Sequence, residues 1–192
     1  MNKNKAHQTA TIAIFFAIML VIQLISNMLF TIWPMPIRPT LVHIPVIIAA
    51  ILYGPKIGSS LGFLMGMMSL ITNSIVILPT SYLFSPFVPN GNLASLLIAI
   101  LPRILIGITP YLIYKRLNNP GGLALSGLVG SLTNTVFVLS GIFIFFAKVY
   151  GGNVKALLAA IISSNALAEM IIAAILVTVM IPRLEAVKKN KK

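Results

Sequence analysis

Long apolar segments recur along this chain, separated by short joints that contain proline, glycine and basic residues. A helix needs about 20 predominantly apolar residues to cross the hydrocarbon core of a bilayer, which is about 30 Å thick, and most of the segments reach that length. The sequence therefore predicts an all-α integral membrane protein built as a bundle of six transmembrane helices. The expected helices cover residues of about 9–32, 40–53, 57–78, 93–115, 122–147 and 155–182.

The composition supports a membrane location for the whole chain. Of the 192 residues, 58% are hydrophobic and 8% are charged, and the mean hydropathy is +1.02, whereas about a quarter of the residues of a soluble domain are charged. We expect a single membrane domain over residues 1–192, with no separate soluble module. The chain has no cysteine, which excludes a disulfide framework, thiol catalysis and a cysteine-based metal site.

The distribution of basic residues predicts the orientation, because cytoplasmic loops of membrane proteins carry an excess of lysine and arginine. If the N-terminal stretch "MNKNKAHQ" is a cytoplasmic tail, the cytoplasmic side holds Lys3, Lys5, Lys56, Lys115, Arg116, Arg183, Lys188, Lys189, Lys191 and Lys192. The outer side then holds Arg38, Lys148 and Lys155. We therefore expect both termini in the cytoplasm. This placement explains the net charge of +12 without nucleic-acid binding.

The second apolar segment is too short to cross the bilayer by itself. About 14 residues that rise ~1.5 Å each give roughly 21 Å of helix. The preceding stretch "WPMPIRPTLVHIP" holds four prolines and cannot form regular helix. Irregular backbone at membrane depth is tolerated where it is buried in protein or lines a cavity. We therefore expect residues 33–45 to form a binding loop or lid, the alternative being a tilted helix with a loop at the membrane interface.

Small residues mark two helix faces. Gly58, Gly62 and Gly66 follow one another at a spacing of four residues, and Ala13 and Ala17 show the same spacing. Residues four apart share one face of a helix, and small ones allow two helices to approach closely. We expect the glycine face to pack within the chain. From the spacing alone, the alanine face fits either internal packing or a partner protein.

A few polar residues lie deep in the apolar segments: Arg103, Asn134, Asn165 and Glu169. Each ionised group at the centre of a membrane costs about 2.5–3.5 kcal/mol, so these side chains should face the interior of the bundle. One interpretation is an Arg103–Glu169 ion pair, with the two asparagines bonding neighbouring helices. The other is a polar patch in an apolar cavity that orients a small ligand. The two interpretations are compatible.

Several motifs are absent from the sequence. There is no G-x-x-x-x-G-K-[ST] phosphate loop, so the chain does not hydrolyse ATP itself, and neither H-E-x-x-H nor G-x-S-x-G occurs. No inverted repeat is evident, which disfavours a self-sufficient secondary transporter. We therefore expect no enzyme activity, no metal site and no cofactor in this chain.

Four stretches carry a resemblance to a known family: "HIPVIIAAILYGPKIG", "TSYLFSPF", "PRILIG" and "SLTNTVFVLSGI". With them the chain resembles the S components, or substrate-binding subunits, of energy-coupling-factor (ECF) vitamin transporters, a kind of ABC importer, and most of all the pantothenate-specific members. The first two stretches add His43 and Ser81 to the candidate substrate-binding residues.

The resemblance implies a division of labour in the cell membrane of a prokaryote. The S component would capture its vitamin on the outer side, under the first loop, and would topple in the membrane to carry it inward. A transmembrane coupling protein would contact Ala13 and Ala17, which match the family's A-x-x-x-A motif. Two ATPase subunits would supply the energy.

The candidate residues suit pantothenate, an anion with an amide and two hydroxyls. Arg103 could neutralise the carboxylate, while Asn134 and Asn165 could bind the amide and hydroxyls. Glu169 fits beside an anion only if it accepts from hydroxyls, pairs with Arg103 or is protonated. Pyridoxine, hydroxymethylpyrimidine or riboflavin remain alternative ligands, and a membrane scaffold without transport activity remains an alternative function.

Overall fold

The computed structural model describes residues 3–32, 40–146 and 163–189. Within these ranges the chain forms helices and no strand, which confirms the all-helical prediction. The helices are α1 (Lys3–Ile32), α2 (His43–Tyr53), α3 (Pro55–Ile75), the short 3-10 helix η1 (Ser81–Leu83), α4 (Leu93–Ile106), α5 (Thr109–Arg116), α6 (Pro120–Phe145) and α8 (Ser164–Lys189).

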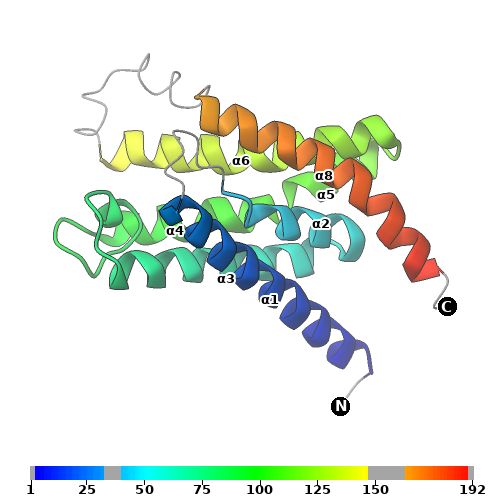
Figure 1. Cartoon of the computed structure of the whole chain (residues 1–192), viewed down its shortest axis with the longest axis horizontal. Coiled ribbons are helices and arrows are strands. Elements are labelled where there is room, and N and C mark those ends of the chain that lie inside the picture. The colour runs from blue at the N-terminus through cyan, green and yellow to red at the C-terminus, as the bar shows by residue number, and fades with distance from the viewer. Residues whose placement is uncertain (1–2, 33–39, 147–162, 190–192) are drawn as a thin grey trace.

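The helices form a layered bundle around α2 (Figure 1). α6 and α8 lie together on one side, α3 and α4 lie together on the other, and α1 crosses α2 and α3 obliquely. α1 begins and α8 ends at the same end of the bundle, which we call the terminal end. The loop of residues 76–92, with η1, lies at the opposite end, which we call the loop end.

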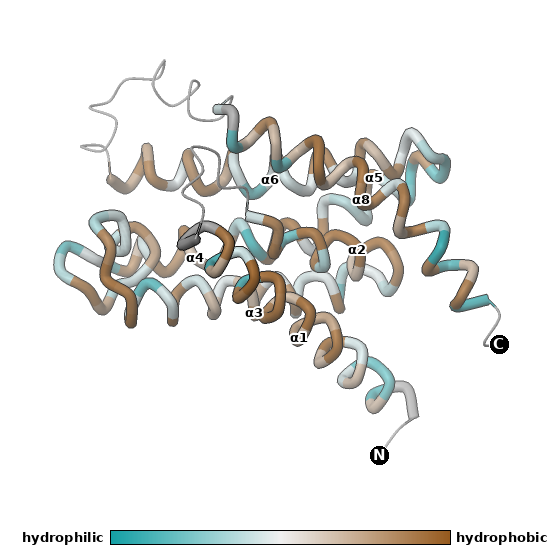
Figure 2. Tube along the Cα trace, viewed as in Figure 1, coloured by the Kyte–Doolittle hydropathy of each residue, from teal (hydrophilic) through white to brown (hydrophobic). Residues whose placement is uncertain are grey.

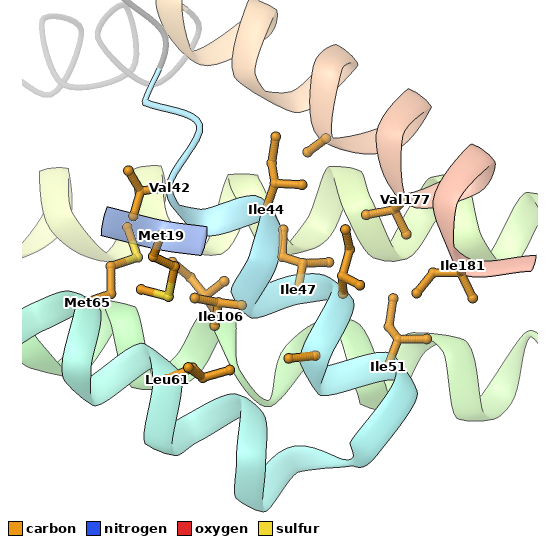
Figure 3. Close-up of a cluster of buried hydrophobic side chains, with 14 of the residues drawn as sticks. Met19, Val42, Ile44, Ile47, Ile51, Leu61, Met65, Ile106, Val177 and Ile181 are labelled. Atoms are coloured by element: carbon orange, nitrogen blue, oxygen red, sulfur yellow. The ribbon is translucent and has the colours of Figure 1, made fainter. Parts of the chain in front are cut away.

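The shortest of the apolar helices, α2, is the centre of the protein. It packs against α1, α3, α4, α5, α6 and α8, and every residue from His43 to Ile51 is buried. Figure 3 shows Ile44, Ile47 and Ile51 of α2 among side chains of the surrounding helices. A helix buried in protein on all sides need not match the bilayer thickness, so the length deficit of this segment has a structural reason.

α2 begins at His43, three residues later than the sequence suggests. Residues 40–42 form a turn in which the Ile44 N–H donates to the Leu41 carbonyl (3.1 Å). Pro45 lies in the first helical turn, where its missing N–H costs no helical hydrogen bond. Residues 33–39, the greater part of the predicted lid, lie outside the described residues.

Within the part of the chain that the structure describes, four helical stretches are long and apolar enough to cross a membrane: Lys5–Leu29, Leu93–Arg116, Pro120–Phe145 and Asn165–Lys189. α3 has 21 residues but contains several glycine, serine, threonine and asparagine residues that lower its hydropathy. Figure 2 shows apolar residues along all the long helices, with hydrophilic residues near the start of α1 and the end of α8. The protein is thus an all-helical, multi-pass membrane protein.

The predicted helix over 93–115 corresponds to the apolar span Leu93–Arg116, which the structure divides into two helices, α4 and α5, at a short turn. Pro110 has no N–H to donate to Ile106, so the hydrogen-bond ladder is interrupted between the two helices. Gly107 sits at the break, and a Cβ on it would collide with the backbone of Gly58 in α3. The close approach of α3 and the proline together explain the interruption.

The last helix also differs from its predicted bounds of 155–182. α8 is described from Ser164 onward, and residues 155–162 lie outside the described residues. At the other end α8 continues through Pro182 to Lys189. Lys188 Nζ donates to the Leu52 carbonyl (2.9 Å), which ties this extension to the end of α2.

The glycine face of α3 packs within the chain, as predicted. A Cβ on Gly62 would collide with the carbonyl of Arg103, and one on Gly66 would lie 2.8 Å from the carbonyl oxygen of Ala99. A Cβ on Gly58 would collide with the Gly107 carbonyl. These three glycines let the backbones of α3 and α4 approach closely and set the depth of Arg103 in the bundle.

Candidate functional site

The packing of α6 places candidate polar residues of three helices within about one helical turn of one another along the bundle. Gly130 of α6 lies against Ile47 of α2, and Gly127 lies against Ala173 of α8. Both α2 and α8 run opposite to α6 (Figure 1). One helical turn toward the loop end, about 5.4 Å on, the Gly130–Ile47 contact leads to Asn134 and His43, and the Gly127–Ala173 contact leads to Ser131 and Glu169.

Several buried polar atoms of α2, α4 and α6 have no hydrogen-bond partner among the described residues. They are both ring nitrogens of His43, Ser131 Oγ and Asn134 Oδ1, together with Nε of Arg103 in α4. Buried polar groups in folded proteins are nearly always paired, and each unpaired group costs about 1–3 kcal/mol. Unpartnered donors and acceptors on α2, α4 and α6 are what a polar ligand in an apolar bundle would satisfy.

Glu169 joins α8 to the chain that enters α2. Its side chain is 7% exposed, and its Oε1 accepts a hydrogen bond from the backbone N–H of Thr40 (2.6 Å). The carboxylate is also close enough to His43 to act on its ring electrostatically. Glu169 therefore fixes the position of Thr40, directly before the turn that leads into α2.

Arg103 points in another direction. It is 8% exposed, its Nη1 donates to the Ile98 carbonyl (2.6 Å), and its guanidinium carbon lies 5.3 Å from the centroid of the Phe84 ring. The described residues contain no Arg103–Glu169 ion pair, so that part of the interpretation is wrong, whereas the bonding of neighbouring helices by the two asparagines stays a prediction. The physical reason is that each charged group forms a hydrogen bond with a backbone group, Arg103 with the Ile98 carbonyl and Glu169 with the Thr40 N–H.

Arg103 lines a cavity of about 200 Å³ between α1, α3 and α4. The polar lining residues that sequence reasoning missed are Gln23, Thr40, Ser69, Thr72 and Asn73. Ser69 and Asn73 are four residues apart on α3 and therefore share a face. Two polar residues at this spacing in an apolar segment indicate a polar helix face, so the sequence could have identified this pair.

Thr40 connects the two halves of the polar region. It lines the cavity beside Arg103, and its N–H is held by Glu169. Thr40, which follows residues 33–39 in the sequence, is therefore bonded to Glu169 and lies in the same cavity lining as Arg103. No sequence signal could have found this contact, since the donor is a backbone N–H that every residue except proline carries.

Ser81 is buried but is occupied by contacts within the loop end. Its hydroxyl accepts from the Leu78 N–H (2.9 Å) and lies 3.1 Å from both Asn73 Oδ1 and the Val76 carbonyl. Because Asn73 lines the cavity, Ser81 positions a candidate ligand-binding amide. A direct ligand contact by Ser81 stays a prediction.

Asn165 lies on α8 one turn before Glu169 and is partly buried. Asn134, one turn after Gly130 on α6, is also partly buried, and its side-chain oxygen is among the unpartnered atoms. The predicted roles of both asparagines in binding a ligand stay predictions, with the structure adding Ser131 as a neighbour one turn from Asn134.

Ala13 and Ala17 lie on an exposed face of α1. Only 6% of the apolar span of α1 is buried, and the exposed large side chains of this helix include Ile14, Ile18 and Val21. The helix contacts the core through its other face, where Met19 is fully buried. The alanines therefore take no part in the described core, and their contact with a partner stays a prediction.

Comparison with known proteins gives two findings. Residues 7–181 match the family described as "ECF transporter, substrate-specific component". The chain is also 46% identical over 195 residues to a protein of Lactococcus lactis subsp. cremoris (strain MG1363) named "Pantothenic acid transporter PanT". That alignment covers 99% of this chain and 100% of the relative, so every polar residue described above lies within it.

Proposed function

Because the chain belongs to the family of ECF transporter substrate-specific components, we propose that it captures pantothenate at the loop end and passes it to a coupling protein for import. The family match confirms the resemblance seen in the sequence. The protein is therefore a substrate-binding subunit of a transporter and not an enzyme. The ligand and the direction of capture are the parts that we propose here.

The observation that carries the proposal is the set of buried, unpartnered polar atoms on α2, α4 and α6. Pantothenate offers a carboxylate, an amide and two hydroxyls, which suit one cation and several neutral donors and acceptors. Arg103, which lines the cavity of about 200 Å³, is the buried cation. His43, Ser131 and Asn134 are not among the residues that line this cavity, and their unpartnered atoms would supply the neutral groups. The near full-length similarity to a pantothenic acid transporter supports the same ligand.

We assign to Glu169 the role of holding Thr40 in place, in the predicted lid of residues 33–45. A carboxylate that accepts the Thr40 N–H uses its charge on a backbone donor, which makes the hydrogen bond shorter and about twice as strong as a neutral one. Glu169 then need not approach the carboxylate of the ligand. This role removes the conflict between a buried carboxylate and an anionic vitamin.

The exposed face of α1 suits delivery to the coupling protein. Ala13 and Ala17 present little side chain, so a partner helix can approach the α1 backbone closely. We propose that ATP hydrolysis belongs to partner ATPases and that this chain carries no cofactor. We also propose six membrane crossings, both termini in the cytoplasm of a prokaryotic cell and the loop end outside, as the basic residues indicate.

Binding measured on the purified full-length chain tests the ligand. Isothermal titration with pantothenate, pyridoxine, hydroxymethylpyrimidine and riboflavin should show saturable binding of pantothenate alone. Tighter binding of one of the other three compounds would overturn the ligand assignment while leaving the family intact. Binding of none of them by a folded sample would favour a scaffold.

A further inference from the structure

A second cavity, of about 570 Å³, lies at the terminal end of the bundle. It is lined by residues from the C-terminal ends of α2, α5 and α8, whereas the candidate vitamin site lies near the beginnings of α2 and α8. Its volume falls in the range of about 300–1,000 Å³ that is usual for small-molecule sites. The proposed vitamin capture does not use this cavity.

The charged lining of the cavity is mainly basic. Lys115, Lys188 and Lys189 face one acidic residue, Glu185. Among the described residues, Glu185 forms no ion pair with these lysines, although it is close enough to Tyr114 to act on it electrostatically. Three lysines against one glutamate leave two net positive charges. These outweigh the partial negative charge of about half an elementary charge at each helix C-terminus.

Lys188 is held in place at the wall of the cavity. Its Nζ donates to the Leu52 carbonyl (2.9 Å) and lies 4.5 Å from the centroid of the Tyr53 ring. An ammonium group has three hydrogens, so this lysine can donate to a ligand while it keeps the Leu52 contact. Lys115 and Lys189 are exposed and can turn toward an anion without losing a described contact.

The cavity changes from apolar to charged along the helices. Ile51 and Leu52 of α2, with Tyr111 of α5, form its less polar part, and the lysines follow nearer the ends of α5 and α8. Tyrosine is enriched where the bilayer meets water, and lysine is enriched on the cytoplasmic side. The polarity of the lining therefore increases in the same order as the polarity of a lipid molecule, from the acyl chains to the headgroup.

We propose that this cavity binds the phosphate headgroup of an anionic lipid from the cytoplasmic leaflet. Basic pockets between spanning helices on that side are suited to anionic headgroups. The lysines would bind the phosphate, and the glycerol backbone with the first methylene groups would cover Ile51 and Leu52. A free phosphate ion would use the lysines and leave the apolar wall exposed, so the composition of the cavity favours the lipid.

Lipid binding to the purified full-length chain tests the proposal. The protein in detergent is titrated with phosphatidylglycerol, with phosphatidylcholine of the same acyl chains, and with inorganic phosphate. Binding is followed by native mass spectrometry and by melting temperature. Phosphatidylglycerol should bind at least about tenfold more tightly than phosphatidylcholine and should raise the melting temperature as bound ligands do. Inorganic phosphate should have little effect.

Two double variants carry the same change of charge. Lys115→Gln with Lys189→Gln should weaken phosphatidylglycerol binding about 10- to 30-fold, from the contribution of each lysine near a membrane surface. Lys5→Gln with Lys56→Gln, at lysines outside the cavity lining, should change it less than about threefold. Replacing Lys115 and Lys189 by arginine keeps the charge and should keep the affinity.

Three results would overturn the proposal. Equal weakening in the two double variants would mean general attraction to a basic surface. Equal stabilisation by inorganic phosphate would mean a site for the free ion, and equal binding of phosphatidylcholine would mean that headgroup charge is not recognised. The melting temperature of each variant without ligand shows whether it is folded, and pantothenate affinity measured on the same samples separates failure of this proposal from failure of the proposed vitamin capture.

Discussion

The two acidic residues of the chain lie toward opposite ends of α8, and their surroundings differ. Glu169, near the loop end, is 7% exposed and holds a backbone N–H. Glu185, near the terminal end, is partly exposed and faces lysines across a cavity. Glutamate therefore has two roles on one helix: Glu169 holds a backbone N–H, and Glu185 lines a cavity together with three lysines.

The two ends as a whole show the same contrast. Toward the loop end, polar atoms on α2, α4 and α6 are buried without described partners, which is costly unless a ligand pairs them. At the terminal end, the charged side chains are exposed to solvent or placed at a cavity edge, where their cost is small. Burial, not residue type, therefore distinguishes the loop end from the terminal end.

The orientation of the two ends gives an all-or-none test. Since the native chain has no cysteine, single cysteines can be placed at Lys5 on the terminal end and at Asn90 on the loop end, both exposed. A membrane-impermeant thiol reagent should label the Asn90 variant in intact cells and the Lys5 variant only after permeabilisation. The reverse pattern would place the proposed capture site inside the cell and break the comparison.

Along α1, a change that touches neither end should stop transport. Replacing Ala13 and Ala17 by tryptophan blocks close approach of a partner helix, so vitamin uptake by cells that contain the coupling protein and ATPases should fall to background. Because both alanines are exposed, pantothenate binding by the isolated chain should change less than about twofold.

Leucine at both positions is the matched control for added apolar bulk, and it should reduce uptake less than tryptophan does. Loss of binding in the tryptophan variant, with assembly of the complex retained, would show that this face supports the ligand site and not the partner.

Arg103 and Arg116 test the contrast in ligand binding. Arg103→Gln removes the buried cation and should weaken pantothenate binding about 10- to 150-fold, as expected for about 1.5–3 kcal/mol in a hydrogen bond to a charged group. Arg116→Gln, the same change at the exposed end of α5, should leave the affinity within about twofold. Titration calorimetry measures both, and similar effects from the two variants would remove the distinction between the ends.

The helices could be predicted because hydropathy is a local property of the sequence. The segments became α2, α3 and α6 within three residues at each end, whereas α1 begins six residues earlier than expected. The break at Gly107 was missed although Pro110 lay in the same apolar run, because prolines occur in membrane helices without ending them. It took the contact with Gly58 in α3 to show why the chain breaks there.

The site was harder to predict because a sequence gives the depth of a residue but not its partner. Arg103 and Glu169 were correctly expected to be buried, yet each bonds a backbone group instead of the other. Ser131 was missed since a serine in "GSLTNT" resembles any small residue between packed helices. Depth follows from hydropathy, whereas partners depend on how the helices are rotated against one another.

The smallest effect is expected from the two glutamates themselves. Glu169→Gln keeps an acceptor for the Thr40 N–H but turns a charge-assisted hydrogen bond into a neutral one, a loss of about 1 kcal/mol. If Glu169 holds Thr40 in place, pantothenate affinity should fall about fivefold, and the melting temperature should fall with or without the vitamin. Glu185→Gln should change neither quantity measurably, because that side chain forms no described hydrogen bond or ion pair.

The size and sign of the Glu169→Gln effect distinguish its possible roles. A loss of affinity far above tenfold with an unchanged melting temperature would mean that the carboxylate binds ligand hydroxyls directly. A gain in affinity would mean that its charge repels the vitamin carboxylate, and that the Thr40 contact is kept at a cost to binding. Calorimetry and thermal unfolding on both variants separate these results, because a group that holds Thr40 in place must affect stability and affinity together, whereas a group that only touches the ligand affects affinity alone.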